Sequence, residues 1–514
     1  MHGVGHGGHP SAAPRSGRTS ARGARHRPYT LAVPLDLTAA AALLDGVWTR
    51  DIEPTLADYI RIPNVSPAFD ADWSTHGHMD RAVTLLADWA RDRPIVGLTV
   101  TRRDLPGRTP VLELRVPAFG DAADAPEVLC YGHLDKQPPM DGWRDGLGPW
   151  EPVREGDRLY GRGGADDGYA LFATLAAVEA VQASGGSHGP LLVLIEASEE
   201  SGSSDLPAHL EAMGDALGRP ALVVCLDSGA IDYERLWVTT SLRGIVIVHL
   251  RVDVLTEGVH SGSAGGVVPS SFRIARQLLD RLEDAATGDL RVDALRVDIP
   301  DERVTQAEAT AAEIATGTGT SDVAFPYAGG TRPHGTTLAE QLLRRSWHPS
   351  LEVVGADGLP ATADAGNVLR PTTALLLSLR VPPTVDAHDA ADAVVAALTA
   401  DPPHGAAVSV TVRGAESGWA APPTAPWLED ALAAASEAAY GRSARAMGEG
   451  GTIPFMGMLG RRFPDAQFVI TGVLGPGSNA HGPNEFIDLA YARRLTLAVA
   501  SLLDASARHN RPSA

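Results

Sequence analysis

Short apolar runs that each stop at a polar loop constrain the fold of this chain more than any other feature. Four such runs are strand-like, at residues 127–132, 190–196, 221–226 and 467–472. A helical stretch at residues 169–182 lies between the first two of them. Strands that alternate with helices are typical of a sheet buried between two helical layers. The sequence therefore predicts an α/β fold with a mainly parallel central sheet covered by helices.

Helical spacing of apolar residues predicts two helices ahead of the first strand, over residues 43–60 and 79–90. The first helix leads into Arg61-Ile-Pro-Asn-Val-Ser and should end before Pro63, because the residue ahead of a proline avoids helical geometry. The middle of the chain predicts a second, smaller domain. Its expected strands lie at 245–254, 374–381 and 407–413, and its expected helices at 271–282 and 387–398.

Length and charge narrow the class of protein. A chain of 514 residues is too long for one compact core, and 44% hydrophobic residues is sufficient for globular folding. A net charge of −20 argues against nucleic acid as a partner, since phosphate binding needs a basic face. Cys130 and Cys225 lie in apolar runs, which favours free thiols in a reducing compartment. Without an export signal or a long apolar run, we expect a cytoplasmic protein and no membrane partner.

Residues 1–35 differ from the rest of the chain. They are rich in Gly, Ser and His, and they contain several arginines but no acidic residue. Such a segment cannot bury enough apolar surface to fold, so we expect a disordered tail. His2, His6 and His9 could bind a metal ion loosely, although a polar tail is the simpler interpretation.

Five loops each contain an acidic residue or a histidine, and they lie after apolar strand-like runs or at the start of a helix. They hold His133 and Asp135, then Asp166 and Asp167, then Glu199 and Glu200, then Asp227, and finally His481. Open α/β sheets keep their ligand sites beyond the carboxyl ends of the strands. Any one carboxylate pair could be solvated loop charge. Mixed imidazole and carboxylate ligands at these positions are, however, what zinc or a similar divalent ion requires.

These motifs, taken together, resemble the dinuclear zinc peptidase and deacylase family of carnosinase, carboxypeptidase G, aminoacylase and succinyl-diaminopimelate desuccinylase. The shared pattern is His-x-Asp, Gly-Arg-Gly-x-x-Asp-Asp, Glu-Glu-Ser-Gly-Ser, a later Asp and a final His. It covers nearly all of the chain after the tail, and the carnosinase-like dipeptidase branch is the most similar. The resemblance implies a catalytic domain at 36–240 and 415–514, interrupted by an α+β lid and dimerisation domain at 241–414.

The resemblance implies a role for each residue of these loops. Asp166 would bridge two metal ions, His133 and Asp227 would complete one site, and Glu200 and His481 the other. Asp135 would hydrogen-bond the imidazole of His133, and Glu199 would be the general base. The ions, zinc or alternatively manganese or cobalt, would lie about 3.5–4 Å apart and activate a shared water. The peptide bond between Asp166 and Asp167 would be cis. Relatives usually have Lys after these two aspartates, but this chain has Gly168.

Three further segments resemble the substrate-binding parts of that family. Gly258-Val-His260-Ser-Gly resembles the segment whose histidine reaches the partner subunit's active site. Arg380 matches the lid arginine that grips the substrate's carboxylate, for which a planar guanidinium is well suited. In Glu449-Gly-Gly451-Thr452, glycines would let backbone amides approach an anion and Thr452 would supply a hydroxyl. A turn histidine, an exposed strand-end arginine and a structural turn are the alternatives.

We therefore expect a homodimeric, metal-dependent dipeptidase or related exopeptidase that acts on small peptides with a free C-terminal carboxylate. A deacylase of N-acyl amino acids is the alternative, since both reactions attack an amide beside a carboxylate. An inactive binding scaffold would be expected to have lost a ligand or the base, and neither is missing from the sequence.

Overall fold

The computed structural model describes residues 35–316 and 325–509. The predicted disorder of the tail, and its histidines, fall almost wholly outside these residues. The helical stretch expected at 43–60 consists of α1 (Leu37–Val47), a π-helical turn η1 (Trp48–Ile52) and α2 (Glu53–Ile60), which ends ahead of Pro63 as predicted. Asp36 begins α1 by accepting hydrogen bonds from the amides of Thr38 and Ala39. The second expected helix is α4 (His78–Arg91), preceded by the short α3 (Trp73–His76).

The central sheet is parallel in its middle, antiparallel at the β1-β2-β6 margin and mixed at the other margin, where β8 is antiparallel to β17 and β15 and parallel to β16. Its strands follow the order β1-β2-β6-β3-β7-β17-β8-β15, and β16 pairs with β8. Their bounds are β1 (Thr99–Arg103), β2 (Val111–Val116), β3 (Val128–His133), β6 (Leu191–Glu196), β7 (Leu222–Cys225), β8 (Trp237–Leu242), β15 (Trp419–Ala420), β16 (Arg445–Glu449) and β17 (Gln467–Ile470). The β6-β3, β3-β7 and β7-β17 pairs are parallel. All four predicted strands therefore lie side by side.

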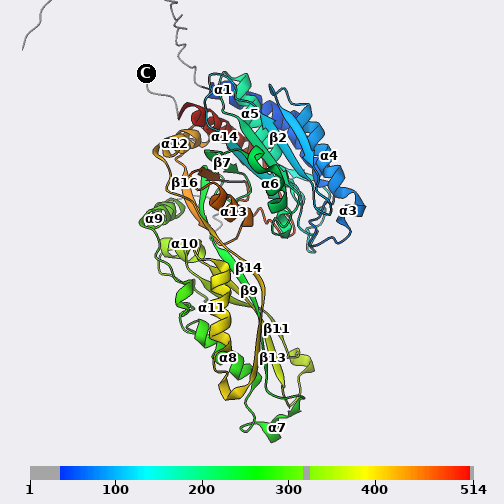
Figure 1. Ribbon diagram of the computed structural model, residues 1–514, viewed down its shortest axis with the longest axis vertical. Coiled ribbons are helices and arrows are strands. Elements are labelled where there is room, and N and C mark those ends of the chain that lie inside the picture. Colours follow the sequence, from blue (N-terminus) through cyan, green and yellow to red (C-terminus); the bar gives the residue numbers. More distant parts are fainter. Residues whose placement is uncertain (1–34, 317–324, 510–514) are drawn as a thin grey trace, which may run out of the picture. The chain divides into compact units, whose positions relative to one another are not determined.

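Helices bury both faces of this sheet. Cys130 of β3 packs into a core with α1, α4, α5 (Ala170–Ala183) and α14 (Leu489–His509). Its neighbours Leu129 and Tyr131 point to the opposite face, into a core with α6 (Leu206–Met213) and α13 (Pro454–Arg462). Because successive strand residues alternate in direction, one apolar run supplies both cores. Figure 1 shows α5 and α14 running along the sheet. Cys130 and Cys225 are buried free thiols, as expected.

The second domain is an antiparallel sheet with helices packed against it. Its strands have the order β11-β13-β9-β14, and Figure 1 shows α8 and α11 lying along them. The bounds are β9 (Gly244–Asp253), β11 (Ser350–Asp357), β13 (Thr372–Val381), β14 (Ala407–Glu416), α8 (Ser271–Leu282) and α11 (Ala387–Thr399). Every element predicted here is present. We call this domain the lid, and its own core is formed by the inner faces of the sheet and both helices.

Smaller elements complete the chain. A short antiparallel pair of β10 (Val259–His260) and β12 (Val368–Leu369), with α7 (Ser261–Ala264), forms one end of the lid. Helices α9 (Asp301–Thr316) and α10 (Leu338–Ser346) pack on each other and against β16, and α12 (Pro426–Tyr440) packs against α14. A small sheet has the order β18-β5-β4, with β4 (Val153–Glu155), β5 (Arg158–Tyr160) and β18 (Phe486–Asp488). Single turns are η4 (Gly214–Leu217), η5 (Asp293–Leu295), η6 (Thr362–Asp364) and η7 (Pro403–Gly405).

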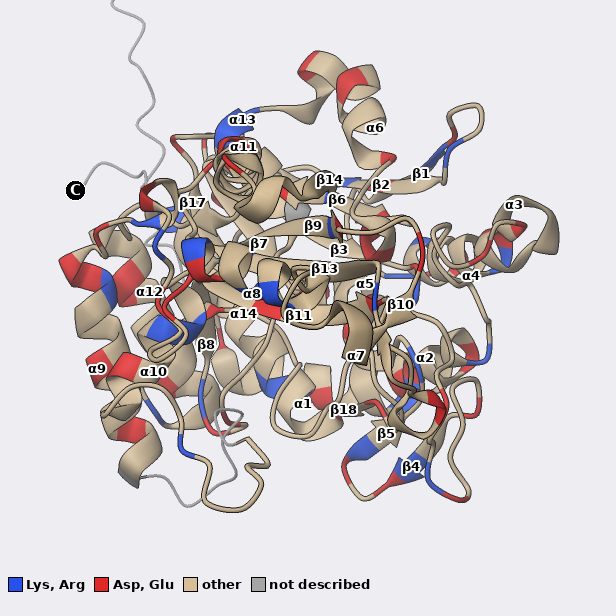
Figure 2. Cartoon of the chain, turned by 90° about the horizontal axis from the view of Figure 1, so that it is seen from below, with Lys and Arg blue, Asp and Glu red and all other residues tan. Residues whose placement is uncertain are grey.

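Acidic residues outnumber basic residues in the chain, 63 to 43. Figure 2 shows acidic residues along α9 and α12, with basic residues interspersed. Among the helices that the structure describes, none is long and apolar enough to cross a membrane.

Candidate metal centre

The ends of three parallel strands bring the predicted ligands together. His133 is the last residue of β3, Glu199 and Glu200 form the turn η3 (Glu199–Ser201) just after β6, and Asp227 follows β7. Asp166 belongs to η2 (Gly164–Gly168), the turn that leads into α5. His481 comes from the loop after β17. Because parallel strands end at the same edge of a sheet, segments far apart in the sequence meet here.

Asp166 lies between the two histidines. Its Oδ1 atom is 3.3 Å from Nε2 of His133, and its Oδ2 atom is 3.1 Å from Nε2 of His481. The two carboxylate oxygens therefore face different imidazoles. The peptide bond between Asp166 and Asp167 is cis, as expected.

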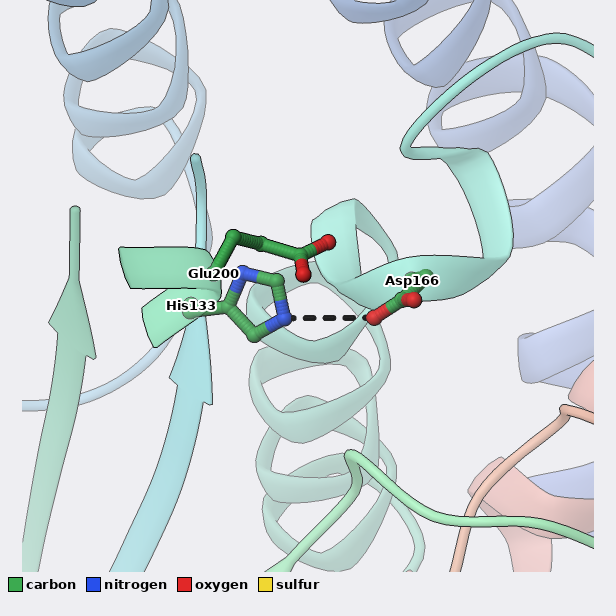
Figure 3. A group of neighbouring side chains, drawn as sticks. All are labelled: His133, Asp166 and Glu200. Carbon is green, nitrogen blue, oxygen red and sulfur yellow. Dashed lines mark hydrogen bonds and ion pairs between the residues drawn. The ribbon is translucent and has the colours of Figure 1, made fainter. Parts of the chain in front are cut away.

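The remaining carboxylates surround this group. Glu200 Oε2 lies 3.3 Å from Nε2 of His481, and Asp227 Oδ2 lies 3.9 Å from Nε2 of His133. Glu199 Oε2 lies 4.0 Å from the same nitrogen of His133. Figure 3 shows His133, Asp166 and Glu200 converging from separate elements.

The spacing and chemistry of these donors fit divalent metal ions. Donors at about 2.0–2.1 Å from a tetrahedral ion stand roughly 3.3 Å apart, close to the separations observed here. One atom of each of His133, Asp166 and Glu200 lies within 4.8 Å of the others, and so does one of each of His133, Glu199 and Asp227. The Oε1 atom of Glu200 is buried and accepts no hydrogen bond from the described residues. A buried carboxylate oxygen without a donor is costly, and a cation would satisfy it.

Crowding of like charges is visible in the pKa values of the site. Burial raises the pKa of Asp227 to about 7, with the Asp166 charge adding to the effect. Burial raises the pKa of Glu199 and of Glu200 well above the usual value, helped by Asp227 and by Asp166 respectively. For His133, burial lowers the pKa, but hydrogen bonds to Asp135 and Asp166 outweigh it and leave the pKa raised. Buried carboxylates this close together are difficult to ionise at the same time, because their negative charges repel one another. Bound cations would compensate these charges.

Asp135 connects two of the ligand loops. Its carboxylate accepts hydrogen bonds from the amides of Glu199 (3.1 Å) and Glu200 (3.0 Å). Its Oδ1 atom lies 3.5 Å from Nδ1 of His133, and its backbone carbonyl is closer, at 3.1 Å. The imidazole therefore hydrogen-bonds the backbone carbonyl of Asp135, while both oxygens of its carboxylate fix the turn that carries the glutamates.

Sequence reasoning missed a buried ion pair that joins two other ligand loops. Arg162 Nη1 donates to Glu485 Oε2 at 2.6 Å, and both side chains are almost fully buried. Glu485 also accepts from the amides of Gly163 and Ala165, while Arg162 Nη2 donates to the carbonyl of Gly482. The loop before Asp166 is thereby held to the loop after His481. Apolar periodicity gave no indication of this contact, because the two residues are 323 positions apart.

Other missed residues contact the ligands directly. Gln137 donates from Nε2 to Oε2 of Glu200, and Asp167 accepts the backbone N–H of His133 at 3.3 Å. Gly168, where relatives usually have Lys, has no room for a side chain. A Cβ atom there would lie 2.2 Å from the ring of Tyr59 and 2.6 Å from the carbonyl of Gly163.

The predicted carboxylate-binding residues lie together at the junction of the lid and the catalytic part. Arg380 Nη1 donates to Thr452 Oγ1 at 3.3 Å, and that hydroxyl donates to the carbonyl of Arg243 at 2.5 Å. Gly451 beside them is exposed, and nothing lies within 4 Å of where its Cβ would be. Burial, together with the charges of Arg380 and Arg345, lowers the pKa of Arg243 to about 10. Cations gathered in this way favour an anion.

His260 is not brought to these residues within the described chain. It is exposed at the end of the lid, where its Nδ1 accepts from the amide of Gly262 at 3.1 Å. Figure 1 shows the adjoining α7 at the end of the lid remote from the central sheet. Its role in a partner subunit stays a prediction.

The clustered carboxylates and histidines, with the inserted lid beside them, make this chain a metallohydrolase. The model of peptidase family M20/M25/M40 matches residues 129–505, and the chain belongs to this family. A cysteinylglycine-S-conjugate dipeptidase of Corynebacterium striatum is 29% identical over 416 residues, which are 79% of this chain and 86% of that protein.

Two solved structures share the fold. The dipeptidase Dug1p of Saccharomyces cerevisiae has a TM-score of 0.70 and 22% identity, with 93% of this chain and 99% of that chain covered. Human carnosine dipeptidase 1 also has a TM-score of 0.70, with 20% identity and coverage of 92% and 99%. At these identities the two structures support the architecture of a catalytic part interrupted by a lid.

Proposed function

We propose that the chain is a dipeptidase that hydrolyses the amide bond of dipeptides or short peptides with a free C-terminal carboxylate, using two divalent metal ions. The observation that carries the proposal is the position of Asp166, whose two oxygens face two different histidines. A carboxylate placed in this way suits a bridge between two ions. We assign His133 and Asp227 to one ion, and Glu200 and His481 to the other.

The bound metal pair, which we propose to be zinc, would supply Lewis-acid activation of a water and of the scissile carbonyl. Within the chain, Glu199 is the base that accepts the water's proton and returns it to the leaving amine. Its raised pKa suits this role, because a base is most effective when its pKa lies near the working pH. Asp135 holds Glu199 in place through the backbone amide of that residue.

The far end of the substrate is the carboxylate. Arg380 and Thr452, which are hydrogen-bonded to each other, can receive it, and the exposed backbone at Gly451 can approach it closely. A guanidinium that pairs with a carboxylate gives both charge and geometry. This end of the site is what would distinguish a free peptide from its amide.

The lid supports the dimer that we propose. Strands β11 and β14 are the edges of its sheet, and β14 is largely exposed. Unpaired edge strands are surfaces on which a second copy can pair. In such a dimer, His260 would reach the partner's site and donate to the oxyanion at the scissile carbonyl. A cytoplasmic location, suggested by the free cysteines, completes the proposal.

A substrate panel tests this function. Purified protein is loaded with zinc or manganese and assayed on dipeptides, their C-terminal amides and N-acyl amino acids. We expect dipeptides to be hydrolysed and the amides to be poor substrates. Hydrolysis of the N-acyl amino acids alone would establish the deacylase alternative, and no hydrolysis by metal-loaded protein would establish the inactive scaffold.

A further inference from the structure

Lys136 is the only lysine in the 514 residues of the chain, and the other basic side chains at neutral pH are all arginines. It follows the His-x-Asp motif directly, and its side chain is completely buried. A protein that uses arginine everywhere else places its single lysine beside the proposed metal centre. The surroundings of this residue explain why.

The ammonium group of Lys136 lies at the carboxyl end of α2. Its Nζ atom donates to the carbonyls of Tyr59 (2.8 Å) and Ile62 (2.7 Å), and more weakly to that of Ile60 (3.4 Å). It also lies 3.9 Å from the centre of the Tyr59 ring. The last carbonyls of a helix lack intrahelical partners and carry partial negative charge, so a cation is favourable there. Among the described residues, no carboxylate forms an ion pair with Lys136.

The same segment of chain is bonded to the ligand loop at further points. Tyr59 Oη donates to the carbonyl of Leu134 at 2.6 Å, Asn64 donates to that carbonyl too, and the amide of Ser66 donates to the carbonyl of Lys136 at 2.9 Å. Residues 59–66 and 134–136 thus form one bonded unit. His133 lies at one end of this unit, and Gln137, which donates to Glu200, lies at the other.

An arginine would not fit in this position. The methylene chain of Lys136 runs against Gly163, where a Cβ atom would come within 2.6–2.7 Å of its Cγ, Cδ and Cε atoms. A compact ammonium can direct three donors at three carbonyls, whereas a guanidinium is a wider, planar fork. Burial lowers the pKa of Lys136 well below its usual value, and the hydrogen bonds to the three carbonyls offset part of the cost of burying the ammonium group.

We infer that Lys136 is a positioning residue of the metal centre, whose ammonium binds the end of α2 and thereby fixes the loop from His133 to Gln137. This inference deepens the proposed function and rests on it only where activity is measured. Partners of metal ligands commonly change metal affinity or activity by about 10–100-fold when they are removed.

The first test compares Lys136→Met with the wild type. Methionine keeps the length and removes the donors, so we expect affinity for zinc, measured by competition with a chelator, to fall about 10–100-fold. In metal-saturated protein, kcat should fall while KM changes little, since no substrate contact is lost. Arg61→Met, which removes an exposed cation from the same end of α2, is the matched control and should behave as wild type. Wild-type metal affinity in Lys136→Met would overturn the inference.

A second variant separates charge from packing, and it applies even if Lys136→Met does not fold. Lys136→Ala leaves a space of the size of the lost side chain, and it is refolded with n-propylammonium or with n-propanol. We expect the ammonium to restore metal affinity at least tenfold better than the alcohol. Equal restoration by both would show that only volume matters. Metal binding needs no substrate, so wild-type protein that binds metal but cleaves no dipeptide would refute the proposed function and leave this inference standing.

Discussion

The metal centre and the end of the lid are built in opposite ways. At the centre, the side chains of His133, Asp166 and Glu200 are at most 6% exposed, and hydrogen bonds from distant parts of the chain fix them. At the end of the lid, the side chain of His260 is exposed and accepts a hydrogen bond from its own turn, while Val267 nearby is 85% exposed. The centre is thus preorganised by its own chain. Among the described residues, the end of the lid has no comparable set of contacts around its histidine side chain.

The largest effect should come from removing the proposed bridge. Asp166→Ala deletes the carboxylate whose two oxygens face the two histidines. We therefore expect the metal content to fall below about two ions per chain, with both sites losing occupancy. Asp227→Ala should empty chiefly one site. Elemental analysis of the purified variants measures the metal content of each. Full metal occupancy in Asp166→Ala would contradict the assignment of Asp166 as the bridging ligand.

Removing the base should leave the centre intact but inactive. Glu199→Gln keeps the size of the side chain and its backbone bond to Asp135, so both metals should stay bound while kcat falls about a hundredfold or more. Single-turnover assays with metal analysis give both numbers. Loss of metal instead would mean that the roles of Glu199 and Glu200 are exchanged.

In the proposed dimer, His260 at the end of one lid reaches the metal centre of the partner subunit. His260→Ala should lower the rate about 10²–10³-fold with its metals intact, as for a lost oxyanion donor. Mixed with inactive Glu199→Ala under conditions of subunit exchange, it should regain roughly a quarter of wild-type activity, because each mixed dimer rebuilds one complete site. Demonstrated exchange without any recovery would mean that His260 acts within its own chain or not at all.

A smaller effect should separate the two ends of the substrate. Arg380→Ala should reduce kcat/KM on free dipeptides about tenfold or more, as a charged hydrogen bond is worth about 1.5–3 kcal/mol. C-terminal amides offer no charge for the guanidinium, so their already low rates should hardly change. An equal loss on both substrates would indicate that Arg380 only supports the lid strand β13.

The last prediction concerns Glu196, the last residue of β6. Its replacement should have the smallest effect on activity but a clear effect on stability. Burial, with the charge of Asp135, raises the pKa of Glu196 to about 7. Because the folded pKa lies above the unfolded value, its stabilising contribution is present below about pH 4.5 and is lost as the pH rises through about 7. Glu196→Gln stays neutral, so its stability relative to wild type should grow by roughly 3 kcal/mol over that range.

Urea unfolding of metal-free protein at pH 5 and pH 8 measures this difference. Glu211→Gln, on the exposed side of α6, is the matched control. If the free energies of unfolding of Glu196→Gln and wild type differ by the same amount at both pH values, the prediction is wrong. The ionised carboxylate of Glu196 would then not be costly to bury.

The sequence predicted the strands and helices well because burial is periodic along the chain. The runs that became β3, β6, β7 and β17 are apolar on both faces, as a covered sheet requires. Most of the residues that converge on the centre could be proposed because they lie just after such a run or open a helix, whereas His481 lies well beyond the end of β17 and was proposed from the family resemblance. Antiparallel pairing at the margins of the sheet was not predicted, since the order of strands leaves no mark in local pattern.

Contacts between distant loops could not be predicted in the same way. Arg162 and Glu485 lie in different loops, and only the folded chain shows them paired and buried. Lys136 is the single lysine of the sequence, but the sequence does not show which groups surround it. The fate of a polar residue depends on what the rest of the fold brings to it, and a local pattern does not contain that information.

The position of β17 has a consequence for how the molecule forms. This strand comes after almost all others in the sequence, yet it lies between β7 and β8 in the sheet. A growing chain that has emerged only as far as β16 therefore presents the hydrogen-bonding edge of β7 without its partner. Long-range pairings of this kind form slowly, and open strand edges invite association with other chains. Until β17 closes that edge, the incomplete chain is exposed to pairing with other chains.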